Sequence, residues 1–96
     1  MKKEEIIKIL KTIREEIRKN YKAEIKGIFG SYAMGRQKEN SDLDILVTFF
    51  EGASLFNLVA LGDFLEKKLN LKVDIVPLDT IREEIKDEIL KNTIYL

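Results

Sequence analysis

Cysteine, histidine and tryptophan do not occur in this sequence of 96 residues, and proline occurs once. Without cysteine there can be no disulfide, no thiolate zinc site and no cysteine nucleophile. Without histidine there can be no Ser-His-Asp triad and no imidazole metal site. Any metal ion would therefore be held by oxygen atoms, which favours hard cations such as magnesium, manganese or calcium.

Long apolar segments are also missing. No run approaches the roughly 20 residues that a membrane-spanning helix needs, and no signal peptide opens the chain. We therefore expect a soluble, cytoplasmic protein with no membrane partner. The length predicts a single domain over residues 1–96, with no room for a catalytic domain beside a separate substrate domain.

The net charge is zero, with 17 basic and 17 acidic residues, but the charges are unevenly distributed. Residues 1–38 hold eight Lys and three Arg against five Glu, whereas residues 39–96 hold six basic against twelve acidic residues. This is not the uniformly basic pattern of a nucleic-acid binder, so no nucleic-acid partner is expected. Most of the charges are expected on solvated helix faces. The alternative is an acidic, cation-holding half beside a basic half that faces phosphates or an acidic partner.

Hydrophobic periodicity predicts helices and strands that alternate along the chain. The expected elements are an amphipathic helix over residues 2–20, strands over 24–29, 43–49 and 72–76, a short helical segment within 30–40, a long helix after Ser54 and a last helix from Thr80. The strand over 43–49 is strongly apolar and is expected at the centre of the sheet. The order α-β-α-β-α-β-α predicts an α/β (α+β) fold, with helices packed against a small sheet.

Local patterns set the expected faces and ends of these elements. Ile25, Gly27 and Phe29 alternate with polar or smaller neighbours, as in a half-buried strand. Thr80 and Glu83 have the spacing of a capping box at a helix start. The apolar stripes expected on the two later helices are Leu55, Leu58, Gly62, Leu65 and Leu69 on the first and Ile81, Ile85 and Ile89 on the second.

Two aspartates stand at the head of the central strand. Asp42 and Asp44 are two residues apart, so their side chains point to the same face, while Leu43 points the other way into the core. A third carboxylate, Asp74, lies within the strand over 72–76. If that strand lies beside the central one, the three carboxylates converge.

Carboxylates so close together repel one another. Two of them about 5 Å apart cost roughly 3 kcal/mol at an effective dielectric constant near 20. Mg²⁺ held by the carboxylates, waters and substrate phosphates would remove this cost. The alternative is that Asp42 caps a turn, Asp44 is exposed and Asp74 lies on an edge strand. An isolated Asp-x-Asp pair favours that alternative, and three carboxylates on strands beside the loop described next favour the cation site.

The segment Gly30-Ser31-Tyr-Ala-Met-Gly-Arg36 follows a predicted strand. Gly30 permits a ligand to approach the backbone closely, and Ser31 offers a hydroxyl beside free amides at the start of a short helix, a position that favours phosphate. Arg36 can add charge-assisted bonds to phosphate oxygens. Taken alone, the loop is equally well explained as a tight turn that needs two glycines.

Two common motifs are excluded here. The spacing from Gly30 to Gly35 resembles a P-loop, but Arg36-Gln37 stands where that motif has Lys and Ser or Thr, so no hydroxyl is left for magnesium. An EF-hand beginning at Asp42 fails because the third oxygen ligand, the glycine and the terminal glutamate are absent at their positions.

The loop and the carboxylates together are more specific than either alone. Gly30-Ser31, ten further residues and then Asp42-x-Asp44 resemble the signature of the DNA polymerase β-type nucleotidyltransferase superfamily, and Asp74 matches the third carboxylate expected on a later strand. The short chain and its Gly-Ser-Tyr-Ala-x-Gly loop resemble the minimal nucleotidyltransferases (MNT) over nearly its whole length. The resemblance implies the polymerase β-type fold.

The resemblance also implies roles for these residues. Asp42, Asp44 and Asp74 would be the catalytic, metal-binding residues for two Mg²⁺ ions, with Asp74 also a candidate base. ATP would be the substrate, and attack at its α-phosphorus would transfer AMP and release pyrophosphate. The nucleotide-binding residues implied in this way are Gly30, Ser31, Arg36 and Ser41.

One position departs from the family pattern. Many relatives carry a basic residue where this chain has Met34. We expect Arg36 to substitute for it.

The resemblance finally implies an acceptor. Many MNT proteins are antitoxins paired with HEPN-type ribonuclease toxins, and transfer AMP to a tyrosine of the toxin. We expect that role here, with a homo- or hetero-oligomeric assembly. Two alternatives stay open: an antitoxin that acts by contact alone, with Phe49, Phe50, Phe56 and Tyr95 as candidate partner-surface residues, and a nucleotidyltransferase that modifies a small molecule.

Overall fold

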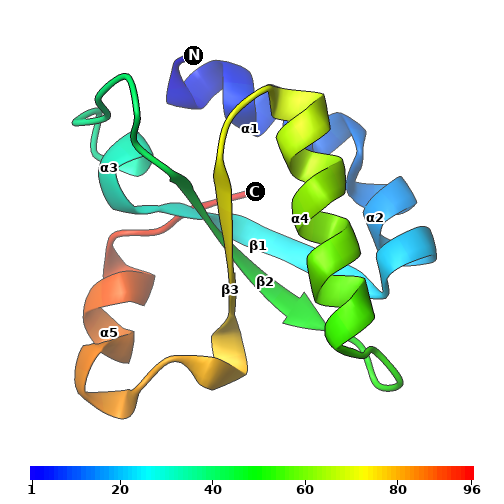
Figure 1. Cartoon of the computed structure of the whole chain (residues 1–96). Helices are drawn as coiled ribbons and strands as arrows, with labels where there is room; N and C mark the ends of the chain where they lie inside the picture. Colours follow the sequence, from blue (N-terminus) through cyan, green and yellow to red (C-terminus); the bar gives the residue numbers. More distant parts are fainter.

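Four strands form a mixed sheet in the order β3-β2-β1-β4 in a computed structural model that describes all 96 residues (Figure 1). The strands are β1 (Ala23–Phe29), β2 (Leu43–Phe49), β3 (Val73–Pro77) and β4 (Ile94–Tyr95). β1 runs antiparallel to β2 and β4, while β2 and β3 are parallel. The mixed α/β fold and the internal position of β2 are confirmed. β4 was not predicted, since two residues carry no periodicity.

The helices are α1 (Lys3–Thr12), α2 (Arg14–Tyr21), α3 (Gly30–Ala33), α4 (Leu55–Leu69) and α5 (Glu83–Lys91), with a 3₁₀ turn, η1 (Leu78–Thr80), before α5. α1, α2 and α4 pack on one face of the sheet, and α5 lies apart from them on the other side of β3 (Figure 1). None of the helices is long and apolar enough to span a membrane.

The core lies between α1, α2, α4 and one face of the sheet. β2 contributes Leu43, Ile45 and Val47, each fully buried, in alternation with residues that face the other side. One of those, Leu46, is fully buried but outside the main cluster, so the second face of the sheet is also covered over part of its length. Asp44 shares that second face with Leu46.

The expected single helix over residues 2–20 is wrong, because Ile13 interrupts it. Ile13 ends α1 and precedes α2 with φ −107° and ψ 8°, outside helical geometry. The apolar spacing continues through the break, since Leu10, Ile13 and Ile17 are all buried. The sequence therefore carries no stop signal here.

The alternation expected in β1 also fails beyond its middle. A register shift between Ile25 and Gly27 marks a β-bulge, and Leu96 donates its backbone N–H to the carbonyl of Lys26 at 3.0 Å. The extra residue changes which side chains face the core. Ile28 is fully buried, whereas Phe29 is only partly buried and faces the side of Asp44, its register partner.

α4 begins as predicted, with the backbone N–H of Ser54 donating to Oδ1 of Asn57 at 2.8 Å. Its buried stripe differs from the expected one: Leu61, which was not on the expected stripe, is fully buried, and Leu55 is 74% exposed. The first turn of α4 lies at the ends of β2 and β3, where Leu55 borders a hollow with Phe49 and Pro77, and the buried positions begin one turn later.

The capping box expected at Thr80 is wrong. The Thr80 hydroxyl donates to the carbonyl of Pro77 at 2.8 Å and closes η1, and α5 begins only at Glu83. Of the isoleucines expected in a row on this helix, Ile81 lies before its start, and the other two are not fully buried, with Ile85 50% exposed. Three residues of 3₁₀ geometry shift the helix start beyond what the capping pattern indicates.

Candidate active site

The register of the two parallel strands places two carboxylates side by side. Asp44 of β2 is the direct partner of Asp74 of β3, and the core residues Leu43 and Ile45 flank Asp44. Since side chains alternate along a strand, Asp44 points away from the core. Paired residues on adjacent strands share a face, so Asp74 points the same way.

Asp42, the residue directly before β2, completes the group. Asp42 and Asp74 are exposed and Asp44 is partly buried. The pKa of Asp44 is raised to about 6, first by burial, then by the negative charge of Asp74 and a hydrogen bond with it, and then by the charge of Asp42. The structure thus brings the three sequence-predicted carboxylates together.

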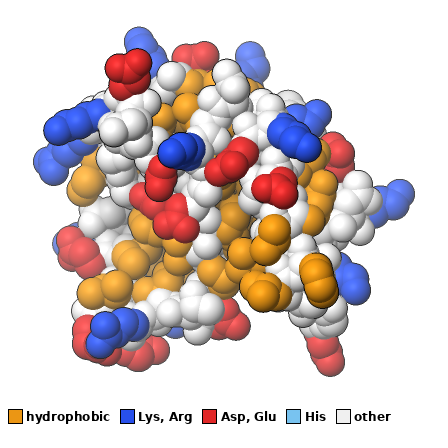
Figure 2. All heavy atoms as spheres, in the orientation of Figure 1, with side chains coloured by type: hydrophobic (Ala, Val, Ile, Leu, Met, Phe, Trp, Pro, Cys, Tyr) orange, Lys and Arg blue, Asp and Glu red, His pale blue; other side chains and the backbone are white.

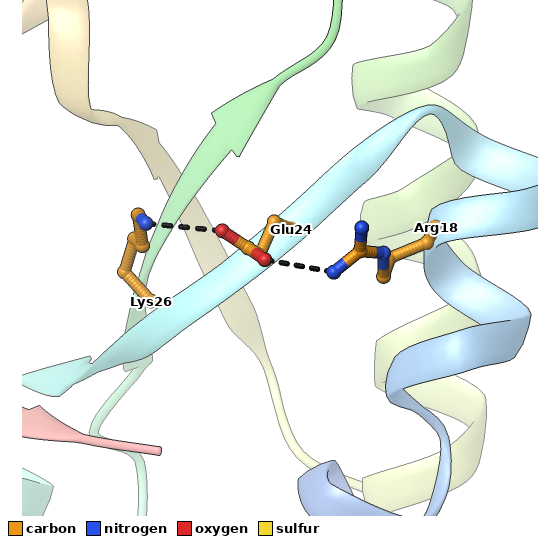
Figure 3. Close-up of polar contacts among 3 residues, drawn as sticks. All are labelled: Arg18, Glu24 and Lys26. Atoms are coloured by element: carbon orange, nitrogen blue, oxygen red, sulfur yellow. Dashed lines mark hydrogen bonds and ion pairs between the residues drawn. The ribbon is translucent and has the colours of Figure 1, made fainter.

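No basic side chain neutralises this group. The ion pairs of the structure are Arg18–Glu24, Lys26–Glu24 and Arg82–Glu84. Glu24 shows the contrast, because Nη1 of Arg18 at 2.9 Å and Nζ of Lys26 at 3.0 Å flank its carboxylate on β1 (Figure 3). The pKa of Glu24 is lowered, chiefly by its hydrogen bond with Lys26 and by the positive charge of Lys26. This shift is opposite in direction to that of Asp44.

The donor set fits a hard divalent cation. The group offers carboxylate oxygens alone, on adjacent strands, with no protein cation to balance them. The three side chains do not form a preformed cage, because no cluster of three or more acidic side chains has the spacing of a metal site. Magnesium commonly uses one or two protein carboxylates and completes its shell with water and phosphate oxygens, so an open group of this kind is compatible with it.

Gly30 brings the loop against the carboxylates. It follows β1 directly and has φ +75°, in the left-handed region that glycine adopts without strain. A Cβ atom built on Gly30 would collide with a carboxylate oxygen of Asp44 and lie 3.1 Å from its Cγ. Only glycine therefore leaves room for this approach.

The rest of the loop is held by its own backbone. Arg36 donates its backbone N–H to the carbonyl of Ser31 at 2.8 Å, and Met34 donates its own to the carbonyl of Gly30 at 3.1 Å. The side chains of Met34 and Arg36 are exposed, and Ser31 is partly buried in the first turn of α3, where backbone N–H groups lack helical partners. Ser31 and the Arg36 guanidinium can therefore both reach a ligand at this loop.

Ser41 has a partner within the protein. Its hydroxyl oxygen accepts the backbone N–H of Lys38 at 2.8 Å and closes the turn that leads to Asp42. The same residue lines a hollow of about 300 Å³ together with Asn70 and Lys72. The nucleotide-binding role of Ser41 stays a prediction. In the structure its hydroxyl stabilises the turn that precedes β2.

Lys3 is a contributor that the sequence reasoning missed. Its Nζ donates to the carbonyl of Ala33 at 3.4 Å and links α1 to the end of α3. The contact joins residues 30 positions apart, so no local pattern points to it. The largest hollow, about 760 Å³ beside α2 and Phe50, contains none of the predicted site residues.

Comparison with known families supports the same class of protein. Residues 7–96 match the family model described as "Nucleotidyltransferase domain". The chain is 39% identical over 93 residues to the protein adenylyltransferase MntA of Thermococcus cleftensis, covering 97% of this chain and 94% of that protein. It is 46% identical over 77 residues to a Methanocaldococcus jannaschii protein provisionally named a protein adenylyltransferase, covering 80% of this chain and 90% of that one.

Solved structures show the same relationship. One that is provisionally described as a minimal nucleotidyltransferase superposes with a TM-score of 0.76 at 33% identity, over 94% of this chain and 95% of that chain. Another, described as a toxin-antitoxin with AMP-PNP, superposes with a TM-score of 0.59 at 29% identity, over 85% of this chain and 61% of that chain. The chain therefore belongs to the nucleotidyltransferase domain family, and within it to the minimal nucleotidyltransferases.

Proposed function

We propose that this chain is a magnesium-dependent protein adenylyltransferase and the antitoxin of a toxin–antitoxin pair. It transfers AMP from ATP to a tyrosine hydroxyl of a HEPN-type ribonuclease toxin and so neutralises the toxin. The observation that carries the proposal is the register pairing of Asp44 with Asp74 beside Asp42, with no basic side chain to neutralise them. The names of relatives that match nearly end to end support a protein acceptor.

The three carboxylates would ligate the cations in different combinations. Asp42 and Asp44 would ligate both magnesium ions, and Asp74 would complete the second site from the neighbouring strand. When bound there, divalent cations would supply positive charge that neutralises the phosphates and stabilises the charge that develops at phosphorus. The raised pKa of Asp44 means that its ionised form is disfavoured beside the other two carboxylates, and a bound cation would relieve that cost.

The loop positions the nucleotide. The β- and γ-phosphates of ATP would lie on the backbone of Gly30 and Ser31, with the Arg36 guanidinium donating to phosphate oxygens. Because Gly30 lies against Asp44, phosphates held there are beside the carboxylates. The structure of a relative with AMP-PNP supports a nucleoside triphosphate as the substrate.

The transfer itself is a displacement at phosphorus. The acceptor hydroxyl oxygen forms a bond to the α-phosphorus, and the bond from that phosphorus to the bridging oxygen of pyrophosphate breaks. The proton of the hydroxyl passes to the Asp74 carboxylate, which is exposed and so reachable by a protein acceptor. Pyrophosphate leaves with its electron pair, and no oxidant or further reactant is required.

The test is incubation of the purified chain with ATP, Mg²⁺ and a HEPN-type toxin from the same genome. Intact-mass spectrometry should show the addition of AMP to the toxin, and peptide mapping should place it on a tyrosine. Toxin that is neutralised without any mass change would instead support an antitoxin that acts by contact. AMP transfer to a small hydroxyl compound, with none to the toxin, would support the small-molecule alternative.

A further inference from the structure

The first turns of α4 expose a group of large apolar side chains. Phe56 is 86% exposed, Leu55 is 74% exposed and Val59 is 54% exposed, and we call these three residues the α4 patch. They lie next to one another because residues three and four apart share a helix face. Residues 52–62 contain no charged side chain, although 35% of the chain is charged. A solvated helix face would carry charge here, so the composition is that of a contact surface.

A groove adjoins the patch. Phe49, Leu58 and Pro77 line it together with Leu55, and its volume is about 370 Å³. That volume is at the lower end of the range that binds small ligands and is sufficient for one large side chain. The groove can therefore bind one aromatic or aliphatic side chain of a partner protein.

The size of the patch argues against a second copy of this chain as the occupant. The three side chains expose on the order of 400 Å². Two such patches facing each other would bury roughly 800 Å², which is less than the 1,200 Å² or more of a stable interface. The patch is therefore part of a larger contact rather than a complete dimer interface.

The charges around the α4 patch also argue against a second copy of this chain as its occupant. Glu51 precedes α4, Asp63 lies one turn after Val59, and Asp79 lines the groove, all three of them exposed. Two basic side chains have contacts at the Glu51 end of this rim: the Nζ of Lys22 donates to the carbonyl of Gly52 at 3.5 Å, and the guanidinium of Arg18 lies 5.5 Å from the ring centre of Phe50. A two-fold pairing of patches would bring the acidic rims together, whereas a basic partner surface would complement them.

The patch and the carboxylates are close enough for one partner to cover both. Figure 2 shows acidic side chains grouped near the middle of this face and hydrophobic ones gathered below them, over the first half of α4 and across toward α5. From Asp44 to Phe49, β2 extends about 16 Å. A standard interface of about 800 Å² per partner is roughly 30 Å across.

We infer that the α4 patch and its groove are the docking surface for the protein that accepts AMP, bound through an apolar anchor with a basic rim. This inference rests on the proposed function, because it takes the acceptor to be a protein. Docking at the patch holds the partner while its hydroxyl reaches Asp74. The partner's own chemistry, an apolar side chain ringed by Lys or Arg, is what the surface recognises.

The experiment compares L55S/F56S with the control K67S, which places serine on an exposed position in the second half of the same helix. The probe is a HEPN-type toxin from the same genome, with its Kd measured by calorimetry and its AMP transfer measured by mass spectrometry. We expect L55S/F56S to weaken the Kd about tenfold or more and to raise the KM for toxin, with kcat at saturating toxin and affinity for Mg-ATP unchanged. K67S should behave as wild type.

If circular dichroism shows that L55S/F56S is unfolded, V59S replaces it as the variant of the α4 patch. A further variant, D79N, tests the acidic residues around the patch. D79N should slow association with the toxin and reduce its dependence on salt.

An unchanged Kd for L55S/F56S, or a wild-type chain that does not bind the toxin, overturns the docking inference. A wild-type dimer that L55S/F56S dissociates overturns it in favour of a second copy. AMP transfer with no effect of the patch variants leaves the proposed function standing without this inference. Patch-dependent binding with no AMP transfer would keep the patch as a docking surface for the toxin, but it would overturn both the proposed AMP transfer and the toxin's role as AMP acceptor.

Discussion

Asp44 and Asp74 are register partners on adjacent parallel strands and face the same side of the sheet. Asp42 lies beside these two carboxylates, and none of the three forms an ion pair with a basic side chain, so they destabilise one another when all are ionised. The burial and neighbouring charges that raise the pKa of Asp44 are the same features that make the group a cation site. Stability and activity are therefore expected to respond in opposite ways to the loss of these charges.

Replacing two of the carboxylates should separate catalysis from contact. We expect D42N/D44N to retain toxin binding and to lose AMP transfer by at least about a hundredfold, because the cations that stabilise charge at phosphorus are no longer held. Growth of cells that express the toxin measures neutralisation directly. If D42N/D44N protects those cells as well as wild type does, contact alone neutralises the toxin and the catalytic account is wrong.

The raised pKa of Asp44 predicts a specific pH dependence of stability in the absence of divalent cations. The unfolded value is 3.8 and the folded value about 6, so between these the folded protein binds the proton more tightly. Stability should therefore decrease as pH rises through this window, with the loss complete above about pH 6. Since Asp44 is only partly buried, solvent screening limits the effect to about 1 kcal/mol.

Urea unfolding of wild type and D44N measures this effect, at several pH values between 4 and 7.5 in low salt with a chelator. The difference in the free energy of unfolding between the two proteins should change with pH, and D44N should be relatively more stable at pH 7.5. Parallel profiles for the two proteins would show that Asp44 is not in the environment described here.

Two glycines of the loop provide a matched pair. Gly30 and Gly35 both have positive φ, +75° and +69°, but only Gly30 lies against another side chain, the Asp44 carboxylate. G35A should cost about 1–2 kcal/mol in unfolding free energy from backbone strain alone. G30A should cost more than G35A and should also reduce AMP transfer, because it displaces Asp44. Equal effects of the two substitutions on AMP transfer would contradict the contact.

Magnesium should stabilise the folded chain through the carboxylates. At a concentration ten times the Kd, a ligand that binds only the folded state adds about 1.4 kcal/mol. In a chain of this size that raises the Tm by roughly 5–10 °C. The comparison is wild type against D42N/D44N in MgCl₂, with NaCl of matched ionic strength as the control. A Tm increase of the same size in both proteins would place the magnesium effect elsewhere.

The sequence was informative where one local pattern determines one feature. The alternation around Asp44 predicts both its strand and the face it points to. Gly30 is expected to leave room for a ligand, and the side chain that the structure places against it is the Asp44 carboxylate. The sequence alone does not determine whether Asp74 lies beside Asp44, because parallel pairing of β2 with β3 depends on the crossover through α4 and not on either strand's own residues.

Other features depend on tertiary contacts that no local pattern carries. The break at Ile13 leaves the apolar spacing intact, and the bulge near Lys26 is fixed by the partner strands β2 and β4. Leu55 has the spacing of a core residue in the sequence, yet it borders an open hollow at the ends of β2 and β3 and is 74% exposed. Hydrophobic periodicity shows that a face is apolar and does not show what covers it.

The most direct test of the account concerns Asp74 alone. A D74N chain is incubated with ATP, Mg²⁺ and the toxin under conditions in which wild type modifies the toxin completely, and the toxin is examined by intact-mass spectrometry. We predict a folded variant that binds the toxin with wild-type affinity and leaves almost all of it unmodified. Toxin fully modified by D74N at the wild-type rate would contradict the account, because the pairing of Asp74 with Asp44 would then have no part in the transfer.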